Sequence, residues 1–177
     1  MRRTNRTPAP LVGILMGSDS DLPTMEEAAK ILQEFAVPFT LHVASAHRSP
    51  DRVARLAREA DGRGFRVLIA GAGAAAHLAG VLAAHTLLPV IGVPMEGGAL
   101  HGLDALLSTV QMPGGIPVAT VAIGKPGARN AALLAVQILA LTDPRLRQRL
   151  VAYRARQAAQ VLVKDRQLQA RHSAARG

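Results

Sequence analysis

Short apolar runs alternate along the chain with longer stretches in which apolar residues recur every three or four positions. The short runs predict buried β-strands, because strands covered on both faces are continuously apolar. The longer stretches predict helices with one apolar face. Five strands are predicted, at residues 11–16, 39–43, 67–70, 89–93 and 118–121. The five helices that follow them are predicted at residues 22–35, 49–62, 77–85, 102–110 and 128–141.

This order of elements, a strand followed by a helix five times over, is typical of a parallel sheet with helices on both faces. The predicted fold class is therefore α/β with a five-stranded parallel sheet. We expect one domain over residues 11–141, preceded by a basic tail at residues 1–10. Residues 142–164 are predicted to form a C-terminal helix that packs on the domain or on a neighbouring subunit, and residues 165–177 a tail.

The last helix of the predicted domain is unusually apolar. From Ala131 to Leu141 it carries a single polar residue, Gln137. A helix that is apolar all round is buried on all sides. Either this helix is central in the fold or a second subunit covers it, and we favour the second subunit.

Composition and charge narrow the classes of function. The chain has no cysteine, which excludes disulfides and thiolate catalysis, and only four aromatic residues, which leaves little to stack on nucleic-acid bases. The formal charge of +9 arises at the ends, with +3 in residues 1–10, +7 in residues 141–177 and −1 between them. Six histidines without paired acidic spacing do not indicate a metal site. We expect no nucleic-acid partner, no membrane helix and a cytoplasmic location.

Polar or glycine-rich loops follow the first three predicted strands, at residues 17–21, 45–49 and 71–77. Ligands of open α/β sheets bind beyond the carboxyl ends of the strands. Parallel strands place these ends at one edge, so we expect the three loops to converge on one small molecule.

The first loop, Gly-Ser-Asp-Ser-Asp, supplies hydroxyl groups and backbone N–H groups at the start of a helix, a combination that favours an anion. Ser18 and Ser20 are candidate donors to this ligand. Asp21 would repel a phosphate but would accept a hydrogen bond from a ribose hydroxyl. Helix capping alone would also explain Asp21.

The second loop combines a cation with a proton carrier. Arg48 has a planar, permanently charged guanidinium that suits phosphate. His47 belongs to the residue type whose protonation changes near neutral pH, which suits acid–base catalysis. Ser45 adds a hydroxyl, whereas Ser49 is expected to cap the helix that begins at Pro50.

The third loop, Gly-Ala-Gly-Ala-Ala-Ala-His, is only superficially similar to a dinucleotide-binding fingerprint. It lacks the third glycine and the later acidic residue, and it follows the third strand rather than the first. Its glycines favour a close approach of the backbone to a ligand, and His77 is expected to begin a helix.

Taken together and in order, these segments resemble the 5-(carboxyamino)imidazole ribonucleotide mutase family, the class I catalytic subunits of phosphoribosylaminoimidazole carboxylase. The resemblance runs from Val12 to about Leu141. Its motifs are Met-Gly-Ser-Asp-Ser-Asp at 16–21, Ser-Ala-His-Arg-Ser-Pro at 45–50, the segment from Ala-Gly-Ala-Gly at 70–73 through His-Leu at 77–78, Leu-Pro-Val-Ile-Gly-Val-Pro at 88–94, Val-Gln-Met-Pro-Gly-Gly-Ile-Pro-Val at 110–118 and Gly-Ala-Arg-Asn-Ala-Ala-Leu-Leu-Ala at 127–135.

The resemblance implies a flavodoxin-like, three-layer αβα sandwich that assembles as a homo-octamer. It implies a step of de novo purine biosynthesis in which the carboxylate of 5-(carboxyamino)imidazole ribonucleotide moves from the exocyclic nitrogen to ring carbon 4, giving 4-carboxy-5-aminoimidazole ribonucleotide. Neither a cofactor nor a metal is implied. The expected partners are the ribonucleotide substrate, other copies of the chain, and, as a functional link, the ATP-dependent enzyme that makes the substrate.

The same resemblance assigns roles to individual residues. His47 matches the general acid/base of the family, and Asp21 matches its ribose ligand. The glycine-rich loop from Gly71 is expected to close over the base and the migrating carboxylate. The full set of expected substrate-binding residues is Ser18, Ser20, Asp21, Ser45, Arg48, Gly71, Ala72, Gly73, His77 and Leu78.

Two alternatives stay open. A related branch of the family carboxylates aminoimidazole ribonucleotide directly with carbon dioxide, and it typically has Lys-Gly-Pro where this chain has Arg48-Ser49-Pro50, which favours the mutase. The other alternative is a non-catalytic nucleotide-binding module.

The chain departs from the family pattern at a few positions near the expected site. Ala74 stands where the family usually has Gly, and Ala79 stands where it usually has Pro. Gly97, Gly98 and Ala105 stand where Ser is common. A glycine at position 74 suggests a backbone with positive φ, so Ala74 bears on the conformation of the third loop.

Overall fold

The structure is a computed structural model of the chain, and it describes residues 9–174. Within that range the sheet has five strands, all parallel, in the order β2-β1-β3-β4-β5. They are β1 (Val12–Met16), β2 (Phe39–Val43), β3 (Val67–Ala72), β4 (Val90–Pro94) and β5 (Ala119–Thr120). The parallel sheet predicted from the hydrophobic pattern is confirmed.

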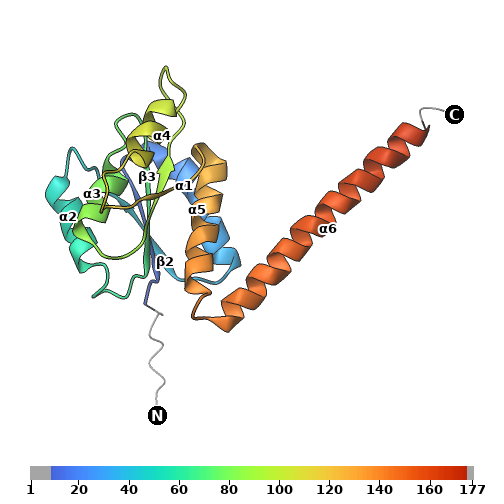
Figure 1. Ribbon diagram of the computed structural model, residues 1–177, viewed down its shortest axis with the longest axis horizontal. Coiled ribbons are helices and arrows are strands. Elements are labelled where there is room, and N and C mark those ends of the chain that lie inside the picture. Colours follow the sequence, from blue (N-terminus) through green and yellow to red (C-terminus); the bar gives the residue numbers. More distant parts are fainter. Residues whose placement is uncertain (1–8, 175–177) are drawn as a thin grey trace, which may run out of the picture. The chain divides into compact units, whose positions relative to one another are not determined.

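Helices cover both faces of this sheet. Figure 1 shows α2 and α3 on one face and α1 and α5 on the other, which is the three-layer arrangement of a flavodoxin-like fold. The helices are α1 (Leu22–Glu34), α2 (Pro50–Glu59), α3 (Leu78–His85), α4 (Leu103–Val110) and α5 (Gly124–Leu139), and a 3-10 turn η1 (Asp19–Asp21) precedes α1.

The centre of the sheet is a row of three isoleucines. Ile14 of β1 pairs with Ile69 of β3, which pairs with Ile91 of β4, and all three side chains are fully buried. Burying each such side chain contributes about 1.5–3 kcal/mol. Beside them, Leu15, Leu68 and other apolar residues of β1, α2, β3 and α3 form a continuous core cluster. This core holds the central strands, and therefore the loops that follow them, in register.

Several predicted boundaries differ from the structure by a few residues, and two of them lie in the last strand and the last helix of the predicted domain. Helix α5 begins at Gly124, four residues before the predicted start, because Pro126 falls in the first helical turn, where no backbone N–H is needed. Strand β5 has two residues rather than four. It lies at the edge of the sheet, where β4 alone supplies partners, at Ile91 and Gly92.

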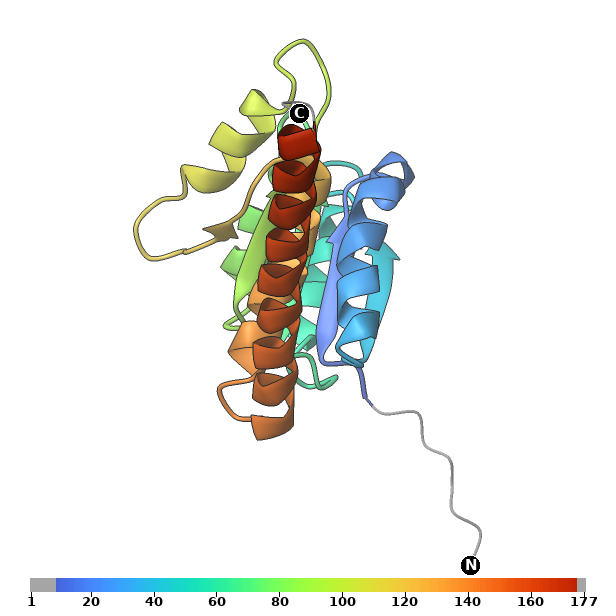
Figure 2. The ribbon, with the colours of Figure 1, turned by 90° about the vertical axis from the view of Figure 1, so that its right-hand side faces the viewer.

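The chain divides into two compact units after Val136, inside α5. The second unit contains α6 (Pro144–Ala174), a helix without interruption over 31 residues (Figure 2). Asp143 caps it, because its Oδ1 accepts hydrogen bonds from the N–H groups of Arg145 at 2.9 Å and Leu146 at 3.2 Å.

Helix α6 continues ten residues past its predicted end at residue 164. Residues 165–174, for which the sequence predicted a tail, are therefore helical. They contain neither Gly nor Pro, and they are rich in Gln, Arg and Ala, which are good helix formers. The predicted basic tail at residues 1–10 lies almost entirely outside the described residues. Over residues 9–174, no helix combines the length and the apolar character that crossing a membrane requires.

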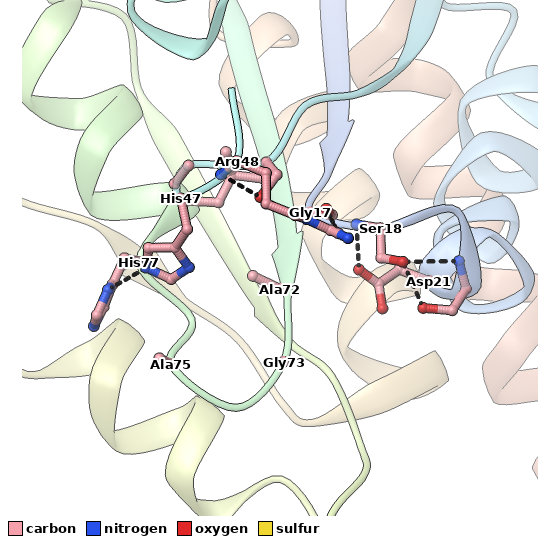
Figure 3. Close-up of a pocket in the computed structure, with 13 residues that line it drawn as sticks. Gly17, Ser18, Asp21, His47, Arg48, Ala72, Gly73, Ala75 and His77 are labelled. Atoms are coloured by element: carbon pink, nitrogen blue, oxygen red, sulfur yellow. Dashed lines mark hydrogen bonds between the residues drawn. The ribbon is translucent and has the colours of Figure 1, made fainter. Parts of the chain in front are cut away.

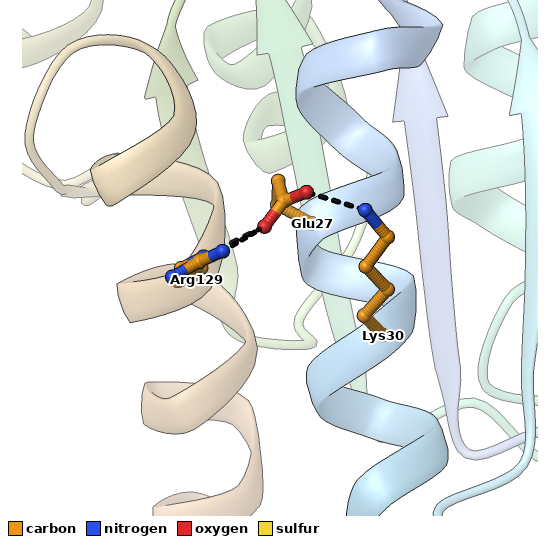
Figure 4. Close-up of polar contacts among 3 residues, drawn as sticks. All are labelled: Glu27, Lys30 and Arg129. Atoms are coloured by element: carbon orange, nitrogen blue, oxygen red, sulfur yellow. Dashed lines mark hydrogen bonds and ion pairs between the residues drawn. The ribbon is translucent and has the colours of Figure 1, made fainter.

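A buried carboxylate joins α1 to α5. Glu27 of α1 is 7% exposed. Lys30 Nζ donates a hydrogen bond to its Oε1 at 2.6 Å, and Arg129 Nε of α5 donates to its Oε2 at 2.7 Å (Figure 4). The hydrogen bond from Lys30, followed by that from Arg129, lowers the pKa of Glu27 to about 2. The ionised carboxylate therefore ties two helices of the same layer together.

We expect Glu27→Gln to destabilise the protein at neutral pH and to make its stability less sensitive to acid. A carboxyl whose pKa falls on folding stabilises the native state above its ordinary pKa of 4.5, and this contribution is lost as the pH falls through about 2. The difference in the free energy of unfolding between wild type and variant should therefore narrow as the pH is lowered through this range. Denaturant titrations at several pH values measure it.

The matched control for this prediction is Glu26→Gln, which neutralises the exposed neighbour of Glu27 on the same helix. This control should change the stability only slightly at any pH, because an exposed charge contributes little. A destabilisation by Glu27→Gln that is independent of pH would contradict the role of the ionised pair.

Candidate functional site

The loops after β1, β2 and β3 line a half-open cavity of about 390 Å³. Strand β1 lies between β2 and β3, and all three are parallel, so their carboxyl ends meet at one edge of the sheet. The three loops line one cavity, as predicted (Figure 3), and the small molecule expected there stays a prediction. The residues that line the cavity are Gly17, Ser18, Ser20, Asp21, Ser45, Ala46, His47, Arg48, Ala72, Gly73, Ala75, His77 and Leu78.

Every residue that the sequence predicts for the site lines this cavity, except Gly71. Three further residues line it that the sequence does not single out: Gly17, Ala46 and Ala75. Their side chains are a hydrogen atom or a methyl group, so they carry no chemical signal of their own. Their position inside the three predicted loops is the only signal that could have identified them.

Gly71 belongs to the core rather than to the cavity. It lies within β3 and is buried. A Cβ at this position would stand 2.6 Å from Sδ of Met25 and 2.7 Å from Cε of Met95. The glycine is therefore needed for the packing of the strand against these methionines, and its contact with the substrate stays a prediction.

The first loop is organised by its own side chains. Asp21 Oδ2 accepts a hydrogen bond from the Ser18 N–H at 3.1 Å, and Ser18 Oγ accepts one from the Ser20 hydroxyl at 2.9 Å. Burial raises the pKa of Asp21, and the hydrogen bond from Ser18 opposes this rise. Ser18 is the N-cap of η1 and Asp21 completes its capping box, whereas the Asp21 side chain makes no capping hydrogen bond to helix α1. Asp21 also lines the cavity, so its role in the turn is compatible with ligand binding.

Hydrogen bonds hold the Arg48 side chain of the second loop against the first loop. Its Nη2 donates to the Gly17 carbonyl at 3.3 Å, and its backbone N–H donates to Ser45 Oγ at 3.2 Å. Arg48 is the only Lys or Arg among the lining residues that the structure describes. It therefore supplies the permanent positive charge of the cavity.

The prediction that the Ser49 side chain caps helix α2 is wrong. Ser49 occupies the N-cap position, but its hydroxyl donates to the Ser45 carbonyl at 3.0 Å and accepts from the Ser45 N–H at 3.1 Å. The Ser49 N–H also donates to the Ser45 carbonyl, so the loop folds back on itself. The Ser49 hydroxyl therefore bonds to Ser45 and not to the first turn of α2. Ser49 closes the loop that carries His47 and Arg48.

The two histidines of the site contact each other. Nε2 of His47 lies 2.8 Å from Nδ1 of His77, and the rings are nearly perpendicular, with centroids 4.9 Å apart (Figure 3). Such a bond requires one of the facing nitrogens to carry a proton and the other to lack one. Within residues 9–174, Nδ1 of His47 has no hydrogen-bonding partner, so it is the nitrogen that remains for a ligand.

The third loop contains a residue with a left-handed backbone. Ala74 has a φ of +51°, so the positive φ suggested by the comparison with the family is observed at this position. A side chain in this region costs about 1–2 kcal/mol relative to glycine. The absence of proline at Ala79 has no comparable effect, because α3 still begins at Leu78 and buries Ala79.

The model of one protein family, described as AIR carboxylase, matches residues 11–160 of this chain. The chain belongs to the AIR carboxylase family. The match covers the three loops of the cavity and all of the described sheet, so the site lies entirely within the family domain.

Curated relatives within this family carry the name N5-carboxyaminoimidazole ribonucleotide mutase. The relative from Pyrococcus abyssi is 61% identical over 145 residues, 82% of each chain. The relative from Mycobacterium tuberculosis H37Rv is 57% identical over 166 residues, 92% of this chain and 94% of its own. A solved structure of PurE from Treponema denticola is 30% identical with a TM-score of 0.81, covering 90% of this chain and 98% of that one.

We expect Arg48→Ala to weaken the binding of a phosphate monoester such as ribose 5-phosphate about 10- to 100-fold, the loss of about 1.5–3 kcal/mol that a charge-assisted hydrogen bond contributes. Titration calorimetry measures this change. The control is Arg52→Ala, which removes an exposed arginine of α2 outside the cavity. Equal affinities of the two variants would contradict a role for Arg48 in phosphate binding.

Proposed function

We propose that this protein is a mutase that moves the carboxylate of N5-carboxyaminoimidazole ribonucleotide from the exocyclic nitrogen to ring carbon 4, a step of de novo purine biosynthesis. The observation that carries the proposal is that His47, Arg48 and Asp21 line one cavity. A proton carrier, a phosphate-binding cation and an acceptor for ribose hydroxyls thereby come together. The names of relatives that are between 52% and 61% identical support it.

The substrate phosphate would bind at the junction of the first two loops. There Arg48 crosses to the carbonyl of Gly17, and the hydroxyls of Ser18, Ser20 and Ser45 lie at the cavity surface. Asp21 has its Oδ1 left for a ribose hydroxyl, because Oδ2 accepts from Ser18. This orientation directs the imidazole base toward His47 and toward the third loop.

His47 would carry one proton through the reaction. Breaking the bond between the carboxylate and the exocyclic nitrogen releases carbon dioxide and leaves an amine, which takes up a proton. Forming the bond between carbon dioxide and ring carbon 4 releases the proton of that carbon. No net proton is gained or lost, so one residue that first donates and then accepts is sufficient.

The small residues of the third loop suit the retention of carbon dioxide between these two steps. Ala72, Gly73 and Ala75 line the cavity and have no side chain larger than a methyl group. The backbone can therefore lie close to the base and to the released carbon dioxide. Holding both reactants in one cavity makes their recombination effectively intramolecular, which lowers the barrier by several kcal/mol. The reaction needs neither a metal nor a cofactor, and we propose that none is used.

We expect His47→Asn to reduce kcat by about 10²- to 10⁴-fold, the usual contribution of a general acid/base. The nucleotide dissociation constant should change little, because Arg48 and the first loop remain. Steady-state kinetics and calorimetry measure the two quantities. His85→Asn, at the far end of α3, is the control and should leave both unchanged. If His47→Asn abolished binding while the fold was preserved, His47 would be a ligand rather than the proton carrier.

An assay with two substrates tests the proposed reaction. The family is described as AIR carboxylase, whereas the relatives are named as mutases, so direct carboxylation is the second candidate. The proposal predicts rapid conversion of N5-carboxyaminoimidazole ribonucleotide and slow conversion of aminoimidazole ribonucleotide at modest bicarbonate. The reverse preference would establish direct carboxylation. Binding of both nucleotides without turnover of either would establish a non-catalytic nucleotide-binding module.

We further propose a homo-octamer in the cytoplasm, functionally linked to the ATP-dependent enzyme that makes the substrate. Large apolar side chains remain exposed in the single chain, among them Leu103, Leu107 and Val110 on α4 and Leu41 and Val43 on β2. Contact between subunits would cover such residues. Light scattering measures the assembly, and the mass of one chain at micromolar concentration would exclude it.

A further inference from the structure

The loop between β3 and α3 brings His77 to His47, but the residues that precede His77 in this loop have no polar side chain that could hold it in place. Residues 73–76 are Gly-Ala-Ala-Ala. Their backbone turns tightly, with hydrogen bonds from the Ala76 N–H to the Ala74 carbonyl at 2.9 Å and from the His77 N–H to the Ala75 carbonyl at 2.8 Å. Ala74 is left-handed, with φ at +51°. A conformation of this kind persists where surrounding structure over-determines it.

A hydroxyl group of α4 contacts this loop. Ser108 Oγ accepts a hydrogen bond from the Ala76 N–H at 3.1 Å. It also lies 3.2 Å from the Ala74 carbonyl, to which it can donate, and within reach of the Asp104 and Ala105 carbonyls of its own helix. Within residues 9–174, no other side chain forms a hydrogen bond to residues 73–76. Ser108 is thus the polar contact between α4 and this loop.

We propose that Ser108 is a positioning residue for the reaction: its hydroxyl holds the left-handed loop so that the ring of His77 meets the ring of His47. Ala76, which Ser108 binds, immediately precedes His77, and Nδ1 of His77 lies 2.8 Å from Nε2 of His47. Ser108 does not line the cavity, so it acts through the loop and not on the substrate. The catalytic consequence rests on the proposed role of His47, whereas the geometric one does not.

The neighbouring Thr109 provides a control for this role, because its hydroxyl bonds only within the helix as far as residues 9–174 are concerned. Its hydroxyl donates to the Ala105 carbonyl of the same helix at 2.7 Å, and among residues 9–174 it forms no hydrogen bond to residues 73–76. Ser108→Ala and Thr109→Val therefore each remove one hydroxyl from α4, and only the first removes a bond to residues 73–76. Alanine is a better helix former than serine, so Ser108→Ala should keep α4 intact.

The test combines kinetics with a readout that needs no turnover. Limited carbethoxylation with diethyl pyrocarbonate, followed by peptide mass spectrometry, measures how fast each histidine reacts. In Ser108→Ala we expect His47 and His77 to react several-fold faster than in the wild type, because the ring nitrogens that bond to each other become accessible. His101 serves as an internal reference. We also expect kcat to fall about tenfold with KM within about twofold, and its dependence on pH to change, since the proton carrier loses its partner. Thr109→Val should change none of these.

The outcomes distinguish the geometric part of the proposal from its catalytic part. Unchanged carbethoxylation of both rings in Ser108→Ala would overturn it, whatever the activity. Faster carbethoxylation with unchanged kcat and pH profile would overturn the catalytic part. If the wild type has no mutase activity, the proposed function fails, and the carbethoxylation rates still decide whether Ser108 positions the histidines.

A second variant tests the left-handed residue directly. Glycine adopts positive φ without the steric cost that alanine meets. Adding Ala74→Gly to Ser108→Ala should therefore recover part of the lost kcat and slow the carbethoxylation of His77 again. A double variant with no recovery in either quantity would show that Ser108 does not act through the conformation of Ala74.

Discussion

Parallel pairing of β1 with β2 on one side and with β3 on the other is the constraint on which the site depends. Met16, the last residue of β1, lies beside Val43 of β2 and beside Gly71 of β3, so the three strands end at almost the same level. Two hydrogen bonds extend this pairing into the loops, from the Ala44 N–H to the Met16 carbonyl at 2.9 Å and from the Gly17 N–H to the Gly71 carbonyl at 3.0 Å. The three loops therefore start side by side and share one cavity.

Behind that edge the sheet is packed with apolar side chains. Gly71 lets Met25 and Met95 approach the backbone of β3. In front of it, Arg48 is the only Lys or Arg among the described lining residues. The formal charge of +9 lies in the two ends of the chain, and it bears on solubility and long-range attraction rather than on the site.

Much of the fold could be predicted because its causes are local. Short runs rich in apolar residues identified all five strands, and Pro50 after Ser49 marked the start of α2. Only the central strands β1, β3 and β4 are buried as predicted, whereas the edge strands β2 and β5 include polar residues and are partly exposed. The cavity was also predictable, because polar loops after parallel strands must share an edge. The function of single side chains was less predictable from the sequence. Ser49 occupies its predicted N-cap position, yet its hydroxyl bonds to Ser45, since the loop folds back in a way that no residue pattern specifies.

The sequence by itself therefore determined the order of the elements, the class of sheet and the loops that carry the chemistry. It did so because strand and helix periods are properties of neighbouring residues. Only the tertiary structure decided which distant side chains meet. His47 and His77 are 30 positions apart, Ala74 and Ser108 are 34 apart, and Glu27 and Arg129 are 102 apart. Such contacts depend on how packed helices and strands place whole segments, and hydrophobic periodicity carries no information about that placement.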